Sequence, residues 1–416
     1  MTHAFMKKKM QDKALQRTQG SALGFAQALK SKRIKEGWTQ EALCKGICSV
    51  SYLSKVENNV LEPSDYFIKS ISKKVGMDLS YYLKTTIGNA HIEEAVDALF
   101  YDDKTKLLHL REAISHSFHQ RSEELFDLFL SVAFQKVQIS QSHISSLEKY
   151  LISMDPFTAY TFFVLWGMHC VEVQAFKKAE ELMTCVVDFE GLNEKLDALS
   201  NTVRFISAQA LRKSLVSLPY FEKALLSCQR MHATQHLMHL ELTRIYYMID
   251  ECVETARRRY IGLKHTLLHH QTSLQHFIDV VFKYHDGTLD AQDFERIKQL
   301  KRDRYFYESL LYFPNNVLKA NQLSEKKQIF NDIDPRHVLY KVQYETSQKT
   351  DTERVHYVKR VALPIAIEKE NLFNIESYTD ELVREASNQS RYKDALALIQ
   401  KKNKALKRLR KVKSST

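Results

Sequence analysis

Apolar residues recur every three or four positions through the first eighty residues, which is the period of an amphipathic helix. In SALGFAQALKSKRIKEG, Phe25 and Leu29 share one face after a possible Ser21 N-cap, and Gly37 can end the helix in a left-handed conformation. A first helix is therefore predicted between Ser21 and Gly37.

Three further short helices are predicted after the first. Thr39 can cap TQEALCK, which stops at Gly46, and Ser49 can cap a third helix in which Leu53 and Val56 face inward. The segment PSDYFIKSISKKVGMDL gives a fourth helix, with apolar residues at core spacing. Four short helices with a tight glycine-containing turn between the second and the third form a helix-turn-helix arrangement.

Beyond residue 90 the pattern stays helical and repeats in a degenerate form. FVLWGMHCVEVQAFKKAEELM places Gly167 and Ala179 twelve residues apart and resembles a tetratricopeptide helix pair, in which small residues let the two helices approach. The pattern predicts a tetratricopeptide-like α-solenoid. The other repeat positions are Trp166, Phe221, Ala224, Tyr247, Ala256, Tyr260, Tyr340, Tyr344, Tyr357, Tyr392 and Ala395.

Composition favours an all-α fold. The 416 residues include only ten glycines and six prolines, the residues that break helices and build turns. The most apolar stretch, residues 157–171, is shorter than the roughly 20 residues of a spanning helix, so a buried core helix and no membrane partner are expected. The first twenty residues lack the apolar core of a secretory signal, and the six cysteines show no paired spacing, which is typical of a reduced cytoplasmic protein.

Charge divides the chain into unlike parts. Residues 1–84 hold 15 Lys and Arg against 7 Asp and Glu, and residues 401–416 hold 8 against none, whereas the remainder is slightly acidic. A compact basic head points to nucleic acid as its partner. The predicted parts are a basic extension at 1–20, a helix-turn-helix DNA-binding domain at 21–84, a repeat domain at 90–400 for peptide binding and dimerisation, and a basic tail at 401–416.

Candidate chemical sites are few. Cys44 and Cys48 have no second Cys or His pair nearby to complete a tetrahedral metal site, so we interpret them as packing residues. His232, His236 and His239 fall on one face of a predicted helix, but HATQHLMHL lacks the glutamate of a zinc-protease helix. The sequence has no phosphate-binding loop, dinucleotide motif or nucleophile-base pair, so we expect no metal, no cofactor and no enzyme.

The segments KSKRIKEGWTQEAL and SYLSKVENN resemble the phage-repressor-like helix-turn-helix family over residues 21–80. ICSVSYLSKVENN followed by PS is similar to the version in Gram-positive peptide-responsive regulators of the PlcR and NprR type. The connection between the second and third helices is one residue shorter than in the phage repressors. The register of individual base contacts is therefore open by one position.

The resemblance implies a recognition helix that enters the major groove with small polar and cationic side chains at the base edges. Gln40 matches a glutamine that contacts phosphate in this family, and Arg33 and Glu57 match an internal ion pair, so we interpret Arg33 as structural. The predicted DNA-binding residues are Gln40, Ser49, Val50, Ser51, Tyr52, Lys55, Asn58 and Lys32.

In the resembled regulators, the groove of the repeats binds a short signalling peptide that shifts the oligomeric or DNA-binding state. An extended peptide needs amides or guanidinium groups to pair its backbone, and a cation for its terminal carboxylate. An ordinary solvent-facing role is equally open for each candidate. The candidates on first helices are Asn201, Arg204, Gln209, Arg244 and Tyr247.

The sequence thus predicts a cytoplasmic, peptide-regulated DNA-binding transcription factor that acts as a homodimer or higher oligomer on an inverted-repeat operator. Two alternatives remain open. The repeats could form a scaffold for a signalling protein such as a sporulation phosphotransfer protein, or the chain could be a prophage-encoded regulator of lysogeny with the same architecture.

Overall fold

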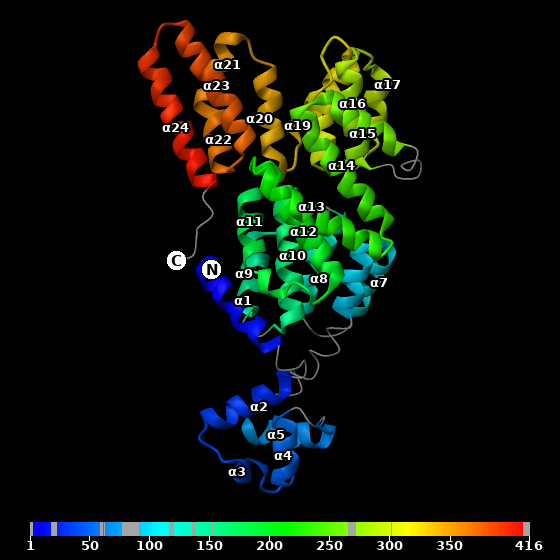
Figure 1. Ribbon diagram of the computed structural model, residues 1–416, viewed down its shortest axis with the longest axis vertical. Helices are drawn as coiled ribbons and strands as arrows, with labels where there is room; N and C mark the ends of the chain where they lie inside the picture. The colour runs from blue at the N-terminus through cyan, green and yellow to red at the C-terminus, as the bar shows by residue number, and fades with distance from the viewer. Residues whose placement is uncertain are drawn as a thin grey trace. The chain divides into compact units, whose positions relative to one another are not determined.

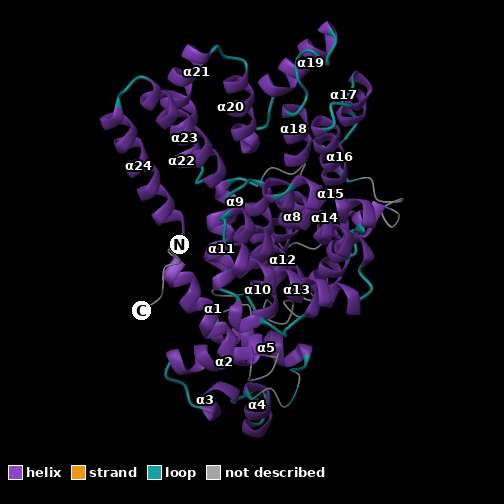
Figure 2. Cartoon of the chain, turned by 45° about the horizontal axis from the view of Figure 1, so that its top comes forward, coloured by secondary structure: helices purple, strands orange, loops and turns teal. Residues whose placement is uncertain are grey.

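Helices make up the regular structure of this protein. The structure is a computed structural model, and it describes residues 3–17, 23–58, 61, 63–76, 91–115, 120–134, 139–151, 154–264, 272–300 and 302–410. Within these ranges every regular element is helical and none is a strand (Figure 2). The all-α prediction is confirmed. The chain divides into two compact units, residues 1–163 with 184–196 and residues 164–183 with 197–416, so the domain limits expected from the sequence stay predictions.

The predicted helix-turn-helix domain lies in the first unit as four helices: α2 (Leu23–Lys35), α3 (Gln40–Cys44), α4 (Val50–Glu57) and α5 (Asp65–Val75). Their starts follow the predicted capping, since Thr39, Ser49 and Ser64 accept backbone N–H bonds from Ala42, Tyr52 and Phe67. The Ser21 cap lies outside the described residues. The helices enclose a core of Phe25, Leu29, Leu43, Cys44, Leu53, Val56, Phe67, Ile68, Ile71 and Val75.

The turn between α3 and α4 depends on a left-handed residue. Gly46 has φ +78°, and a Cβ built there would meet no atom within 4 Å. The glycine is therefore needed for its backbone conformation and not for space.

The basic extension at the N-terminus forms a docked helix. Helix α1 (His3–Arg17) buries Met6 and Met10 completely and packs on the short helix η1 (Val187–Phe189). The His3 imidazole Nε2 lies 2.9 Å from the Thr184 hydroxyl. The other named helices of this unit are α7 (Lys104–Ser115), α8 (Gln120–Phe134), α9 (Gln141–Tyr150) and the start of α10 (Pro156–Glu172).

The second unit is a succession of helices (Figure 1), consistent with an α-solenoid. Helices α14 and α15, and helices α23 and α24, pack against each other as antiparallel pairs. The helices are α11 (Phe176–Thr184), α12 (Glu194–Ala210), α13 (Ser214–Arg230), α14 (Thr234–Glu251), α15 (Val253–Lys264), α16 (Ser273–His285), α17 (Ala291–Lys298), α18 (Arg304–Leu311), α19 (Ala320–Asn331), α20 (Val338–Ser347), α21 (Asp351–Tyr357), α22 (Leu363–Glu368), α23 (Leu372–Asn388) and α24 (Tyr392–Arg410).

Five hairpin turns of this unit use a left-handed residue that is not glycine. Gln174, Arg212, His232, Glu370 and Ser390 have φ between 53° and 60°. The residue after each of them donates its backbone N–H to a carbonyl five positions earlier, as in the bond from Arg391 to Ala386 at 2.7 Å. This turn explains how so many hairpins form in a chain with ten glycines.

Glycine serves a different purpose at Gly167 in α10. A Cβ built there would lie 2.7 Å from the Met183 methyl and 3.2 Å from Val203. Ala179, its predicted partner position, is fully buried. Met183 and Val203 thus approach the α10 backbone closely at Gly167, whereas a direct approach of Ala179 to Gly167 stays a prediction. Within the described ranges, no helix combines the length and the apolar character needed to cross a membrane.

Candidate functional site

Helix α4 presents one buried face and one open face. Leu53 and Val56 are almost fully buried in the core of the domain, whereas Ser51 and Lys55 are exposed. Val50 is 37% exposed. The N-terminal half of the helix therefore offers small polar, apolar and cationic groups to the solvent, the combination that reads base edges in a major groove.

A buried ion pair connects three of the four helices. The Arg33 guanidinium donates to both carboxylate oxygens of Glu57, at 2.6 and 3.0 Å, and also to the Trp38 carbonyl at 3.0 Å. The Glu57 side chain is 1% exposed. Its hydrogen bond to Arg33 raises the pKa of the guanidinium. The Arg33 guanidinium is thus held by partners within the domain.

Two of the predicted DNA-binding residues also have internal partners. The Gln40 side-chain amide donates to Glu57 at 2.8 Å, so this glutamine supports the Arg33–Glu57 pair. The Tyr52 ring packs edge-on against Phe67 at 5.2 Å, and its hydroxyl accepts the Ser64 backbone N–H at 3.0 Å. Both side chains are half-buried, and their positions are set by the fold.

The remaining predicted DNA-binding residues are at the surface. Ser49 caps α4 by accepting the Tyr52 N–H at 3.1 Å, and Asn58 follows the last turn of the helix. Lys32, on α2, forms an ion pair with Glu36 at 2.7 Å. These exposed or half-buried groups stay predictions as DNA contacts, as do Ser51 and Lys55 on α4.

Sequence reasoning missed the role of Lys74 in the domain. Its ammonium donates to the carbonyl oxygens of Ala42 and Lys45, each at 2.9 Å, and so caps the C-terminal end of α3. Cys44 is buried in the core and Cys48 is half-buried, where burial raises the pKa of the Cys48 thiol. The sequence carried no signal for the role of Lys74, because this residue lies some thirty positions away from the helix that it caps.

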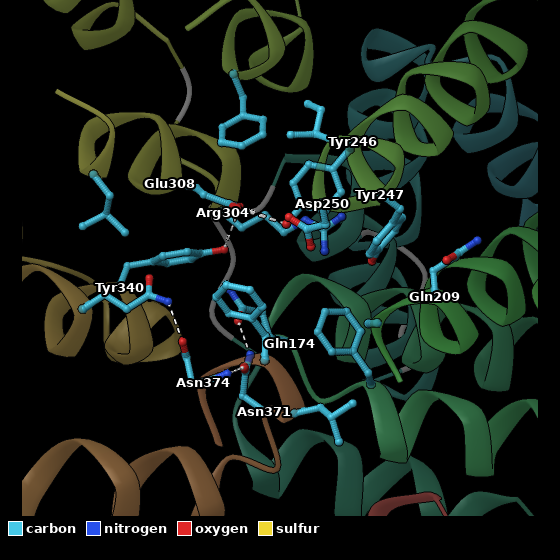
Figure 3. Close-up of a pocket in the computed structure, with 18 of the residues that line it drawn as sticks. Gln174, Gln209, Tyr246, Tyr247, Asp250, Arg304, Glu308, Tyr340, Asn371 and Asn374 are labelled. Carbon is cyan, nitrogen blue, oxygen red and sulfur yellow. Dashed lines mark hydrogen bonds between the residues drawn. The ribbon is translucent and has the colours of Figure 1, made fainter. Parts of the chain in front are cut away.

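The second unit contains a cavity of about 250 Å³. Its walls come from the turn after α10 and from α12, α14, α16, α18, α20 and α23 (Figure 3). The lining combines charged, amide and aromatic side chains. They include Gln174, Gln209, Arg212, Tyr246, Tyr247, Asp250, Phe277, Arg304, Glu308, Tyr312, Tyr340, Gln343, Asn371 and Asn374.

One part of the pocket holds ionisable groups. The Glu308 carboxylate accepts hydrogen bonds from the Tyr246 hydroxyl at 3.1 Å and from the Tyr340 hydroxyl at 3.5 Å. Burial raises the pKa of Glu308 from 4.5 to about 7, against the opposing effect of Arg304. Asp250 lies at the rim, 3.9 Å from Arg212, and partial burial raises its pKa as well.

Another part of the pocket holds a run of side-chain amides. Asn371 donates to the Gln174 side-chain oxygen at 3.0 Å, and Gln343 donates to the Asn374 side-chain oxygen at 2.7 Å. Asn371 also accepts the Asn374 backbone N–H at 3.0 Å and caps α23. Figure 3 shows the amides of Gln174, Asn371 and Asn374 gathered in one region, and the ends of Arg304, Glu308 and Asp250 in another.

The five predicted peptide-binding residues separate into two groups. Gln209 and Tyr247 line the pocket. Asn201 is buried and donates to the Asp197 carbonyl at 2.9 Å, Arg204 is buried and donates to the Met183 carbonyl at 3.2 Å, and Arg244 lies over the Phe221 ring at 4.8 Å. The structure does not bring these last three into the pocket.

The pocket residues that sequence reasoning missed come from several helices, and two of them, Arg304 and Glu308, are on α18. Arg304 and Glu308 are four positions apart within RYFYESLLYF. Two opposite charges one turn apart in a mainly aromatic and aliphatic segment are a visible signal, since charges are rarely buried without a purpose. The amides of α20 and α23 carried no such signal.

The predicted histidine face is wrong for His232. This residue lies in the turn before α14, with φ +53°, whereas His236 and His239 are on the helix. The His236 ring is buried against the Thr202 hydroxyl at 3.1 Å, and burial lowers its pKa to about 3. Among the described residues no group of three metal-ligating side chains is close enough to hold an ion.

The comparison with protein families agrees with the geometry of the N-terminal helices. A helix-turn-helix family model matches residues 29–82, from within α2 to beyond α5. No curated protein and no solved structure matches this sequence. The N-terminal region is a helix-turn-helix domain, and the protein is a DNA-binding transcriptional regulator.

Proposed function

We propose that this regulator is peptide-responsive, in the manner of the PlcR and NprR type: a short signalling peptide binds the pocket of the second unit and changes the oligomeric or DNA-binding state of the protein. The observation that carries the proposal is the run of side-chain amides along the pocket wall. Peptide ligands satisfy their own backbone groups against such amides, and specificity then comes from side-chain pockets.

The run of side-chain amides keeps donors and acceptors that its internal hydrogen bonds do not use. The Gln174 side-chain oxygen accepts a bond from Asn371, and the Gln343 side-chain nitrogen donates one to Asn374. The Gln174 nitrogen, the Asn374 nitrogen and the Gln343 oxygen are then left to face a ligand. Two donors and an acceptor, from the turn after α10, from α23 and from α20, match the alternating N–H and C=O groups of an extended backbone.

On DNA, the proposed reading surface is the N-terminal half of α4, with Val50, Ser51, Tyr52 and Lys55 toward the bases. Gln40, Ser49, Asn58 and Lys32 would contact phosphates or fix the register. One such domain reads a half-site, so two copies of the chain on an inverted repeat are part of the proposal.

The test uses synthetic peptides from the small reading frames beside the gene. A matching peptide at one hundred times its Kd should stabilise the full chain by about 2.7 kcal/mol, and the shift in Tm should depend on concentration. Gln343→Ala should weaken this peptide about 2- to 10-fold, because one hydrogen bond is lost. Asn321→Ala, which removes an exposed amide on α19 outside the pocket, is the matched control.

The proposal fails if no such peptide, and no random hexapeptide mixture, stabilises the chain. It also fails if Gln343→Ala and Asn321→Ala bind the matching peptide with equal affinity. In the first case the helical repeats of the second unit would have to act on a different class of partner.

A further inference from the structure

Two carboxylates from different helices lie together in the pocket. Glu308 is on α18 and Asp250 is near the end of α14. We infer that this part of the pocket receives a positively charged group, the side chain of an arginine or a lysine of the ligand. The inference rests on the proposed function, because it assigns one residue of the proposed peptide to one part of its site.

The Glu308 carboxylate has neutral neighbours where a cation would normally be. Its hydrogen-bond partners are the hydroxyls of Tyr246 and Tyr340, and in the described part of the chain it forms no ion pair. Asp250 meets Arg212 only at 3.9 Å, the outer limit of an ion pair. The Arg304 charge acts on Glu308 but forms no ion pair with it. A buried carboxylate without an ion-pair partner is less stable in its charged form, and a ligand cation would relieve this cost.

The rings around the carboxylates suit a cation as well. Tyr246 packs against Phe277 at 5.4 Å, and Phe277 packs against Tyr312 at 5.7 Å. The faces of aromatic rings attract ammonium and guanidinium groups. The pocket already contains one example, because the Arg304 guanidinium lies 5.8 Å from the centre of the Tyr246 ring.

Arg304 does not fill the role of the missing cation. It is 4% exposed and belongs to the wall, where it lies over the Tyr305 ring at 4.4 Å and donates to the Tyr305 hydroxyl. Its charge also acts on Glu172, outside the pocket. Arg304 is therefore held in the wall and forms no ion pair with Glu308 or Asp250 among the described residues.

The size of the cavity favours one side chain over a whole peptide. A volume of about 250 Å³ is below the range of roughly 300–1,000 Å³ that is usual for pockets that enclose a complete ligand. The amide run beside it would then pair the backbone that leads away from the buried side chain. The cavity acts as the anchor position of the peptide.

The test compares cationic probes with neutral probes of the same shape on the full chain. N-acetyl-arginine amide is paired with N-acetyl-citrulline amide, and hexapeptide mixtures with arginine fixed at one position are paired with the same mixtures carrying citrulline. We expect the arginine probes to bind at least about tenfold more tightly in titration calorimetry at constant ionic strength. The formal net charge of +11 disfavours a general attraction of cationic probes to the chain as a whole.

Two variants locate the preference. Asp250→Asn changes a rim residue that tolerates substitution, and Glu308→Gln changes the inner carboxylate. In each, the ratio between arginine and citrulline probes should fall to about 3 or less, whereas Asn321→Ala should keep it. Equal binding of both probe types by the unmodified chain, or an unchanged ratio in both variants, would overturn the cation inference and leave peptide binding standing. Absence of any binding by the mixtures would overturn both proposals.

Discussion

In the helix-turn-helix domain the buried carboxylate of Glu57 meets the Arg33 guanidinium at 2.6 Å, whereas in the second unit the Glu308 carboxylate meets only the hydroxyls of Tyr246 and Tyr340. The first arrangement is complete in the free protein, because guanidinium and amide donors satisfy Glu57. The second has no ion pair, and the Arg304 charge opposes the burial of Glu308 only in part. The ion pair fixes the packing of the helix-turn-helix domain, whereas the proposed ligand would supply the missing ion-pair partner of Glu308.

The largest effect on stability is expected at the Arg33–Glu57 ion pair. Arg33→Met should lower the free energy of unfolding of the domain by about 3–5 kcal/mol, because Glu57 would stay buried with only the Gln40 amide as donor. Urea denaturation followed by circular dichroism, together with operator binding, measures the loss.

The double variant Arg33→Met with Glu57→Leu provides the control. Removing both charges should recover a large part of the loss, since two apolar residues leave no unpaired group. A double variant as unstable as Arg33→Met alone would mean that packing, and not the unpaired carboxylate, causes the destabilisation.

The open face of α4 should respond differently from the buried pair. Ser51→Ala combined with Lys55→Ala should cost about 1–3 kcal/mol of operator preference for each residue, while the domain keeps its stability because both side chains are exposed. Competition binding with a selected operator and a random duplex, at a fixed salt concentration, gives the preference. A double variant that still prefers the operator would contradict the assignment of the reading face.

Local signals explain how much of the helix-turn-helix domain could be predicted. Thr39, Ser49 and Gly46 act on backbone groups within three residues of themselves, so the sequence alone indicates where the helices begin and end. The Arg33–Glu57 pair was expected from family resemblance, because nothing local joins two residues twenty-four positions apart.

The pocket could be predicted only in part for the same reason. Its lining spans residues 174–374, and a single sequence holds no record of which of these helices meet. Gln209 and Tyr247 were found because the repeat pattern placed them on first helices. Asn201 and Arg204, chosen on the same ground, fall on the buried side of α12, since the degenerate repeats did not define which face of that helix is open.

A pH titration of stability sharpens the contrast between the carboxylates of Glu57 and Glu308. Burial raises the pKa of Glu308 from 4.5 to about 7, so the folded state binds this proton more tightly than the unfolded state. The stabilisation is complete below pH 4.5 and is lost as the pH rises through about 7. Glu308→Gln removes the titration, so its stability relative to the unmodified protein should rise by about 1–3 kcal/mol between pH 5 and pH 8.

Urea denaturation of both proteins across this pH range measures the difference, and subtraction removes the contribution of the seventeen histidines. Arg304, Asp250, Tyr246 and Tyr340 face Glu308 and remain in both proteins. A constant difference between the two stabilities would show that Glu308 is ionised throughout, as expected for a carboxylate with a close cation.

The smallest effect is expected at the turns. Both regions use the left-handed backbone conformation there, but the helix-turn-helix domain places a glycine in it and the second unit places residues with side chains. Gly46→Ala should destabilise the helix-turn-helix domain by about 1–2 kcal/mol, because φ is +78° and the surrounding space is open, so the cost is that of the backbone alone. Ser390→Gly, between α23 and α24, should stabilise the second unit by about 0.5–1 kcal/mol, since φ is +59° and glycine adopts it without strain. Thermal unfolding of both variants measures the two shifts, which should have opposite signs.

If Ser390→Gly proved destabilising, the serine would be contributing more through its bonds in the folded turn than its backbone strain costs. The hairpin turns of the second unit would then be held by their side chains, as the helix starts of the helix-turn-helix domain are held by Thr39, Ser49 and Ser64.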